Sequence, residues 1–365
     1  MRGDSNPEAA AFADEIRTFI QRHWRNQGLA PQRRASAEFM SALVKQGWSV
    51  PDWPVAEGGT GWTHGQRYLF ERELALADAP ALDFFAANVL GTLLLDAGTS
   101  AQRDLHLPLI RENRARWCVH PSIWGAAPLI ACDPTGNASE IRFENCAIGC
   151  DGAAGAHWLA ALVAIEPDQS SLVLIPLDRT EVQAGLPPDR DQIIFDDLVL
   201  TAASILGREG AGQMLVEAAL ARARSLPWAR IPRCRSALQR VMVLVADHPD
   251  LDQASRGSFK TRLAALEIEL LGLDILEQRI AVAAGELSAE AIMVRIKSRE
   301  LSTEIFTLMI EVLGYYALPD PDPLNLDNEG PIGGRYSQGA IEELFRYVGG
   351  LETMTERDQI AALKF

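Results

Sequence analysis

The first third of the chain carries apolar residues at the spacing of helices. The predicted helices of this part span residues 8–23, 36–47, 65–78, 82–97 and 100–111. The first of them places Phe12 and Ile16 about one turn apart. Ser36 is predicted to cap the second helix at its N-terminus, and Gly47 is predicted to end it.

The pattern changes between about residues 116 and 207. Short apolar runs alternate there with turns of Gly, Pro, Asp and Asn. The clearest runs are residues 158–165, 171–177 and 192–200. Runs of this length between turn residues are typical of strands, so this part is predicted to be a small β-domain.

Long helices return after residue 211. Residues 260–284 carry leucines along one stripe up to Gly285, and Ser288 is predicted to cap a further helix that ends at Gly314. Two neighbouring helices with wide apolar faces imply a bundle, predicted as a four-helix bundle. The predicted fold class is therefore α+β, with a helical domain over 1–115, a β-barrel-like domain over 116–208 and a helical bundle over 209–365.

Composition narrows the possible partners and the compartment. The 365 residues are 48% apolar, enough for a sizeable core, and the formal net charge of −15 argues against nucleic acid or an anionic membrane as the main partner. No apolar run is long enough to predict a membrane-spanning helix, and no secretory signal is predicted. The five cysteines show no disulfide or metal-site spacing, so no metal is predicted and the cytoplasm is the expected location.

Several strings in this order resemble the acyl-CoA dehydrogenase family. They are the loop Gly47–Gly61 (G-W-x-x-P-x-W-P-x-E-x-G-G-x-G), the helical string Phe70–Ala75, Gly98–Gln102 (G-T-x-x-Q), Phe195–Leu200 and Leu313–Pro319. The resemblance covers nearly the whole chain and is strongest to bacterial members that act on fatty-acyl or steroid CoA thioesters. It implies FAD as cofactor, acyl-CoA as substrate and an electron-transfer flavoprotein as electron acceptor.

The resemblance also implies a carboxylate base, which removes the α-proton of the acyl-CoA while the β-hydrogen leaves as hydride to the flavin. The family places this base at one of two positions, and here they hold Ala223 and Gly349. Neither residue can accept a proton, so no catalytic residue is predicted. The nearby carboxylates of Glu217, Glu352 and Glu356 are expected to be solvated charges on helices.

The flavin contacts implied by the resemblance are also reduced. Of the family string S-E-P-x-A-G-S-D, the stretch from Ser122 keeps the serine and little else, while Gly149 and Cys150 stand where the family has an aromatic wall and a hydroxyl donor. Gly314 and Gly350 complete the positions matched to the cofactor. An alternative is that the loops align differently and that unconventional contacts still hold FAD.

Three functions follow from this resemblance. The first is a non-catalytic subunit that works beside a second acyl-CoA dehydrogenase chain, since family members form dimers or tetramers through the C-terminal bundle. The second is an active FAD-dependent dehydrogenase of a bulky acyl-CoA, assembled with itself. The third is an acyl-CoA-binding or regulatory module without redox chemistry. The glycines of residues 58–61 are expected to make turns, and His120 and His157 are expected to have structural roles.

Overall fold

The protein was analysed as a computed structural model that describes most of the chain. The described residues are 7–24, 29–82, 84–124, 129–131, 140–150, 152–166, 169–184, 192–224, 229–248, 250–283 and 289–317. Two compact units result, each assembled from separate stretches of sequence. Unit 1 comprises Met1–Ala42, Trp62–Ala81 and Ser225–Phe365, and unit 2 comprises Leu43–Gly61 and Leu82–Arg224. The contacts divide the chain at other positions than the sequence pattern does. The division into three domains therefore stays a prediction.

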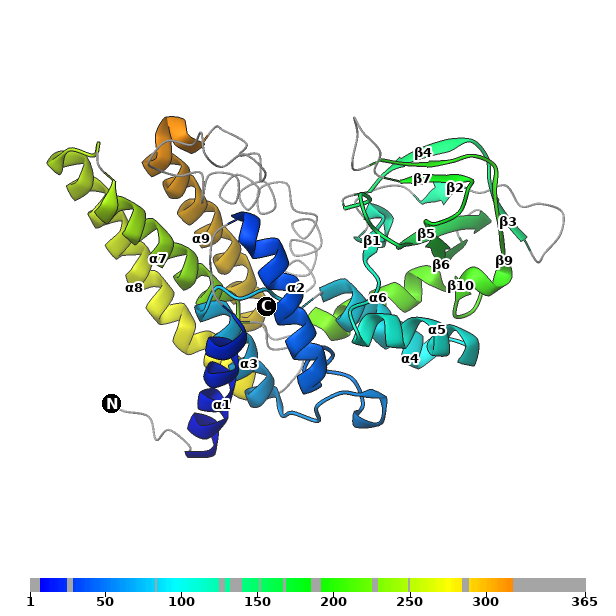
Figure 1. Ribbon diagram of the computed structural model, residues 1–365, viewed down its shortest axis with the longest axis horizontal. Helices are drawn as coiled ribbons and strands as arrows, with labels where there is room; N and C mark the ends of the chain where they lie inside the picture. The colour runs from blue at the N-terminus through cyan, green and yellow to red at the C-terminus, as the bar shows by residue number, and fades with distance from the viewer. Residues whose placement is uncertain are drawn as a thin grey trace. The chain divides into compact units, whose positions relative to one another are not determined.

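Helices dominate unit 1 (Figure 1). They are α1 (Pro7–His23), most of α2 (Leu29–Gln46), α3 (His64–Leu76), α7 (Arg230–Asp247), α8 (Gln253–Ala283), α9 (Ala289–Leu313) and the short 3-10 helix η5 (Gly314–Ala317). The three long helices α7, α8 and α9 run side by side around one apolar core. That core contains the predicted stripe of α8, from Leu263 through Leu266 and Leu270 to the partly buried Ile280. The last amphipathic helical stretch that the sequence predicts, after Gly334, lies outside the described residues.

The predicted start of the second helix is wrong. Helix α2 begins at Leu29 and continues through Ser36, so Ser36 does not cap it. Pro31 lies in its first turn, where a residue without an N–H group costs no intrahelical hydrogen bond. The predicted end is confirmed: Gly47 has φ of +77°, and the N–H of Trp48 donates to the carbonyl of Leu43, as in a glycine-terminated helix.

Unit 2 joins short helices to a β-domain (Figure 1). Its helical elements are η1 (Val55–Glu57), the π-helix η2 (Phe84–Leu90), α4 (Gly91–Ala97), α5 (Ser100–Arg111), η3 (Pro121–Trp124), η4 (Ala202–Ser204) and α6 (Gly212–Arg224). The string G-T-x-x-Q has a structural explanation here. Thr99 and Gln102 form a reciprocal capping box at the start of α5, and the Gln102 amide donates to the carbonyls of Ala203 and Ile205.

In the described part of the chain, ten strands form three sheets. The strands are β1 (Trp117–Val119), β2 (Ile130–Ala131), β3 (Glu140–Phe143), β4 (Cys146–Gly149), β5 (Trp158–Glu166), β6 (Gln169–Pro176), β7 (Val182–Ala184), β8 (Gln192–Phe195), β9 (Leu198–Thr201) and β10 (Ile205–Leu206). One sheet has the order β1-β5-β6-β10 with β2 also on β5, and the others are β3-β9 and β4-β8-β7. The three sheets share one apolar core, in which Phe143 and Phe195 are fully buried.

The run over residues 192–200 was predicted as one strand and is two. Strand β8 pairs with β4 and β7, whereas β9 pairs with β3 in another sheet. The chain changes direction at Asp197, which has φ of +54°. Aspartate tolerates this left-handed conformation, and the apolar alternation of the sequence continues across the turn without revealing it.

The segment over residues 82–97 also differs from the single α-helix that was predicted. Its first half is wound as the π-helix η2, and only the second half is the α-helix α4. The indole N–H of Trp53, from the Gly- and Pro-rich loop, donates to the carbonyl of Ala87 at 2.7 Å. In a π-helical turn the main-chain carbonyls change their hydrogen-bond partners. A side chain from outside the helix can then donate a hydrogen bond to one of these carbonyls.

Candidate functional site

Ser122 lies in η3, directly after β1, and its side chain is buried. Its Oγ is 2.8 Å from Nδ1 of His120 and accepts the N–H of Leu162 on β5 at 3.2 Å. The Ser122 N–H also donates to the same His120 nitrogen. Burial lowers the pKa of His120, which favours a neutral ring with a nitrogen able to accept. The Ser122 hydroxyl therefore ties η3 to β5, and His120 has the structural role expected of it.

Gly149 and Cys150 face different surroundings. Gly149 ends β4 opposite Gln192 of β8, is exposed, and has open space where a Cβ would stand. Cys150 is 1% exposed and belongs to the apolar core of the β-domain. The thiol of Cys150 therefore lies among core side chains, while Gly149 lies on the surface. The two positions do not line one common face.

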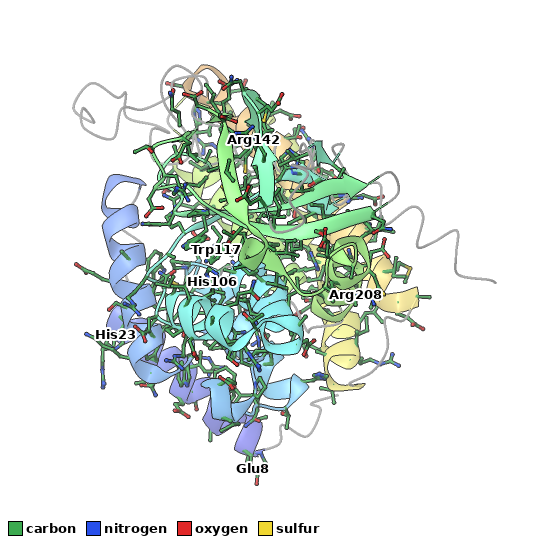
Figure 2. All side chains as sticks on the ribbon, turned by 90° about the vertical axis from the view of Figure 1, so that its right-hand side faces the viewer. Glu8, His23, His106, Trp117, Arg142 and Arg208 are labelled. Atoms are coloured by element: carbon green, nitrogen blue, oxygen red, sulfur yellow. The ribbon has the colours of Figure 1, made fainter. Side chains whose placement is uncertain are left out.

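The rings of His106, Trp117 and Trp158 meet where α5 reaches the sheet, and Figure 2 shows His106 and Trp117 close together. Trp117 of β1 stacks on Trp158 of β5 with 5.6 Å between ring centroids, because the parallel pairing of the strands places them directly opposite each other. His106 of α5 contacts both indoles edge to face, at 5.3 and 4.7 Å. Burial lowers the pKa of His106 to about 4, so the ring is neutral at physiological pH. Trp158, the tryptophan nearest to Gly149 in the sequence, is thus engaged inside unit 2.

Of the two positions matched to the family base, Ala223 lies among the described residues and Gly349 does not. Ala223 lies in the last turn of α6. Glu217, one of the three nearby carboxylates, is exposed and accepts a hydrogen bond from Gln213 at 2.7 Å, as expected of a solvated helix charge. Gly314 begins η5 with φ of +54° and open space around it. The remaining positions Gly349, Gly350, Glu352 and Glu356 lie outside the described residues.

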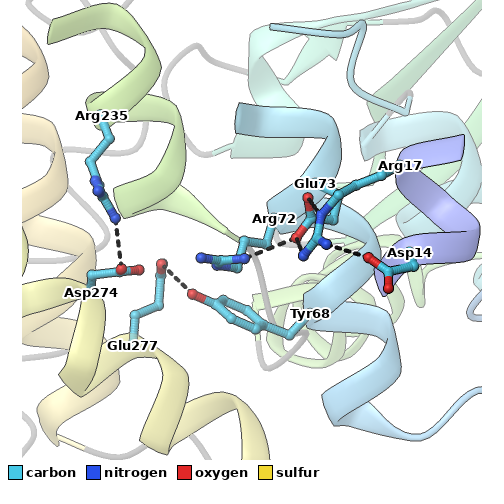
Figure 3. Close-up of polar contacts among 8 residues, drawn as sticks. All are labelled: Asp14, Arg17, Tyr68, Arg72, Glu73, Arg235, Asp274 and Glu277. Carbon is cyan, nitrogen blue, oxygen red and sulfur yellow. Dashed lines mark hydrogen bonds and ion pairs between the residues drawn. The ribbon is translucent and has the colours of Figure 1, made fainter. Parts of the chain in front are cut away.

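The string over residues 70–75 holds buried ion pairs that its pattern did not reveal. Glu71 is 2% exposed and is paired with Arg67 at 2.7 Å and with Arg233 of α7 at 3.5 Å. Burial acts to raise the pKa of Glu71, but the two guanidinium charges outweigh it and lower that pKa. Glu73 accepts from Arg17 of α1 and from Arg72 (Figure 3). The acidic residues of this string therefore join α3 to α1 and α7.

Glu277 of α8 is another buried carboxyl that sequence reasoning missed (Figure 3). Its oxygens accept the N–H groups of Arg230 at 2.8 Å and Ile231 at 3.2 Å, and Tyr68 approaches at 3.4 Å. Burial raises the pKa of Glu277 to about 8 despite these hydrogen bonds. The carboxyl supplies the cap that Ala229, the residue before α7, cannot provide. Glu277 lies on a different helix from the one that it caps, so the sequence around the start of α7 does not reveal this cap.

The described positions matched to flavin were tested for their fit to that group. A flavin site needs polar atoms turned toward the cofactor and room for its ring. The hydroxyl of Ser122 is engaged by His120 and Leu162, and the thiol of Cys150 lies in the core. Gly149 and Gly314 have open space beside them, but neither contributes a side chain. These residues do not fit a flavin cradle, and FAD binding by this chain stays a prediction.

Within the described part of the chain, no group of three or more His, Cys, Asp or Glu side chains is placed to hold a metal ion. Among the described helices, none combines the length and the apolar character needed to cross a bilayer.

Comparison with known proteins finds a family model that matches the N-terminal part of the chain. Residues 6–113 match the family model described as acyl-CoA dehydrogenase, N-terminal domain. The chain is 29% identical over 195 residues to acyl-CoA dehydrogenase IpdE1 of Mycobacterium tuberculosis, covering 49% of this chain and 50% of that protein. It is 24% identical over 303 residues to acyl-CoA dehydrogenase FadE26 of the same organism, covering 76% of this chain and 75% of that one. The match to IpdE1 thus spans about half of that relative's length.

Solved structures share the architecture over the full length. The structure described as the Tcur3481-Tcur3483 steroid ACAD has a TM-score of 0.74 at 18% identity, covering 100% of this chain and 98% of that one. The ChsE4-ChsE5 complex from Mycobacterium tuberculosis has a TM-score of 0.69 at 20% identity, covering 98% and 97%. At these identities the structures establish the fold alone.

The fold is that of the acyl-CoA dehydrogenases, which confirms the predicted fold class. The chain carries that family's N-terminal domain over residues 6–113, and the resemblance predicted from its sequence strings is confirmed.

Proposed function

We propose that this chain is a subunit of an acyl-CoA dehydrogenase complex in which a second, catalytic dehydrogenase chain supplies the base and most of the flavin contacts. The observation that carries the proposal is the identity of the two base positions, Ala223 and Gly349. A side chain that accepts the α-proton must have a basic atom, and neither residue has one. The inward engagement of Ser122 and Cys150 supports the same conclusion.

The partner in this proposal is a homologous chain of the same fold. Two structural neighbours bear names of paired chains, the Tcur3481-Tcur3483 steroid ACAD and the ChsE4-ChsE5 complex. By analogy, the proposed complex oxidises a bulky acyl-CoA, such as a steroid-derived thioester, and passes the electrons to an electron-transfer flavoprotein. This chain would complete the interface or shape the acyl pocket. The proposed location of this complex is the cytoplasm, where cysteines without a disulfide framework stay reduced.

A second candidate is an active FAD-dependent dehydrogenase. The curated relatives named as acyl-CoA dehydrogenases favour it, since one of them matches 76% of this chain. In this case one of the carboxylates near the base positions, Glu217, Glu352 or Glu356, would take the α-proton.

The visible absorption spectrum of the purified chain separates the two candidates. We expect no flavin band from the chain alone, and a yellow complex with about one FAD per two chains when a dehydrogenase chain encoded beside it is co-expressed. Stoichiometric flavin in the lone chain would contradict the proposal and favour the active enzyme. No flavin in either sample would favour an acyl-CoA-binding module instead.

Activity of the complex gives a second, independent comparison. Glu217→Gln, Glu352→Gln and Glu356→Gln in this chain are each expected to leave the turnover of an acyl-CoA unchanged, because the base belongs to the partner. Removal of the partner's base should abolish turnover. A loss of more than about 100-fold in any of the three variants, with flavin content unchanged, would identify the base in this chain.

A further inference from the structure

Asp274 and Glu277 place two buried carboxyl groups on neighbouring turns of α8. They are 7% and 5% exposed, and residues three apart on a helix lie on the same face. Figure 3 shows both carboxyl groups at the junction of α8 with α3 and α7. The negative charge of Asp274 contributes to the raised pKa of Glu277, as expected of two groups that lie close together.

One oxygen of this pair lacks a hydrogen-bond donor. Oδ2 of Asp274 accepts a hydrogen bond from Arg235 of α7 at 3.0 Å. Oδ1 of Asp274 is buried and has no donor among the described residues. Leaving a buried acceptor without a donor is costly, and such groups are rare in folded proteins. A neighbouring group that can carry a hydrogen is therefore expected to donate to Oδ1.

Glu277 is the neighbour that can donate this hydrogen. Its oxygens accept the N–H groups of Arg230 and Ile231, and the hydroxyl of Tyr68 approaches at 3.4 Å. A protonated carboxyl carries one O–H group, which needs an acceptor of its own. Oδ1 of Asp274 is a buried acceptor on the same face of the same helix. One proton on Glu277 thus satisfies its own O–H group and the free oxygen of Asp274.

Two ionised carboxylates at this junction would be unfavourable. Burial disfavours each charge, and each negative charge disfavours the other. Among the described residues, Asp274 forms an ion pair with Arg235, whereas Glu277 forms none. Neighbouring carboxyl groups in such surroundings titrate as a pair and retain one proton between them.

The other ionisable groups around the pair keep one charge state between about pH 5 and 9. Burial raises the pKa of Tyr68 and raises that of Cys234 to about 11, so both side chains stay neutral. The arginines of the surrounding helices stay positive. These arginines are Arg72 of α3, which is paired with Glu73, Arg230 and Arg235 of α7, and the buried Arg295 of α9. Of these groups, the carboxyl pair alone changes its charge in this range.

We propose that Asp274 and Glu277 share one proton and that this proton closes the junction between α8 and the start of α7. Opening of the junction exposes both carboxyl groups to water and releases the proton to the solvent. A rise in pH therefore favours the open form. This inference goes beyond the proposed function and does not depend on flavin or on a catalytic partner.

The first test is carbon NMR of the full chain, with labels on the carboxyl carbons of Asp and Glu. Asp274→Asn and Glu277→Gln assign the two signals, since each variant removes one of them. Both carbons are expected to shift by comparable amounts in one step near pH 8, because a shared proton belongs to the pair. Glu267→Gln, exposed on the same helix, should leave both signals in place.

Two results of this experiment would overturn the shared proton. A step confined to the carbon of Glu277 would place the proton on that residue alone. The absence of any step between pH 5 and 9 would show that both groups are ionised throughout. In Asp274→Asn the step of Glu277 should move down by about one pH unit or more, because the neighbouring negative charge is gone. Circular dichroism checks that the helices of each variant are intact.

Hydrogen exchange tests the opening of the junction. The amides of Arg230 and Ile231, which donate to Glu277, should lose protection about tenfold per pH unit between about pH 5 and 8 and level off above, after correction for intrinsic exchange. In Glu277→Gln their protection should not depend on pH, whereas Glu267→Gln should retain the slope of the parent chain. A level profile in the parent chain, or an unchanged slope in Glu277→Gln, would overturn the proposal.

Discussion

The indole N–H of Trp53 donates to the main-chain carbonyl of Ala87 at 2.7 Å, and its ring covers Gly91. A Cβ on Gly91 would lie 2.3 Å from Cζ2 of that ring. Asp52, beside Trp53, accepts a hydrogen bond from Asn88 at 2.8 Å. These contacts hold the loop that carries the P-x-W-P string against the π-helix η2. The string that resembles the family therefore marks a packing arrangement inside unit 2.

Trp53→Phe is expected to destabilise the protein by about 1–3 kcal/mol, because it leaves a buried carbonyl of η2 without its donor. Gly91→Ala should have an effect of similar size through overpacking against the same ring. Urea unfolding measures both. An unchanged midpoint in Trp53→Phe would show that the carbonyl of Ala87 finds another partner.

Gly59→Ala is expected to be among the most destabilising substitutions in the loop. A Cβ at this position would lie 1.7 Å from the carbonyl oxygen of Trp53, so the backbone would have to move. Gly65→Ala in the first turn of α3 is the matched control, since no atom lies within 4 Å of its Cβ and alanine favours helices by about 1 kcal/mol. The melting temperature should fall for Gly59→Ala and should stay level or rise for Gly65→Ala. Equal melting temperatures would argue against a structural role for this glycine.

Glu71→Ala should cost about 3–5 kcal/mol, because the buried Arg67 would lose this ion pair. The pKa of Glu71 is lower in the folded state than in the unfolded chain, so its stabilising contribution is present above the unfolded pKa and is lost as the pH falls through the folded pKa. The parent protein is therefore expected to lose stability on acidification, and Glu71→Ala to lose less. Glu217→Ala on exposed α6 should change stability by under about 0.5 kcal/mol.

Glu277 is expected to produce the opposite dependence on pH. Its folded-state pKa of about 8 lies above the value of the unfolded chain, so the folded state binds a proton that the unfolded state has released. The stabilising contribution is thus complete below the unfolded pKa and is lost as the pH rises toward 8. Glu277→Gln should flatten this decline between pH 5 and 8, as measured by urea unfolding at several pH values. Glu267→Gln, exposed on the same helix, is the control, and an unchanged slope in Glu277→Gln would contradict the prediction.

Ser122→Ala separates a structural from a cofactor role at the position matched to the family's flavin string. The N–H of Leu162 would lose its acceptor, which should cost about 1–3 kcal/mol. Flavin content of the co-expressed complex should stay the same, because the hydroxyl is engaged within the protein. Lower flavin content at unchanged stability would show that Ser122 reaches the cofactor.

Local patterns in the sequence determined most of the element order. The helix over residues 100–111 and the glycine that ends α2 were predicted correctly because their signals, a capping box and a glycine in the left-handed region, lie within a few residues. The stripe of α8 was predicted because helical periodicity shows which side chains share a face.

Tertiary structure alone decided where particular side chains point and what they contact. Contacts between residues far apart in the chain bury Cys150, bond Ser122 to β5 and let Glu277 cap α7. The π-helix η2 and the turn at Asp197 likewise depend on distant partners. Such contacts leave no periodic signal, because a hydrogen bond between distant residues constrains only the two positions it joins. The sequence by itself therefore determined the resemblance to the family and most of the order of elements along the chain. The folded structure decided which polar atoms are engaged inside the protein.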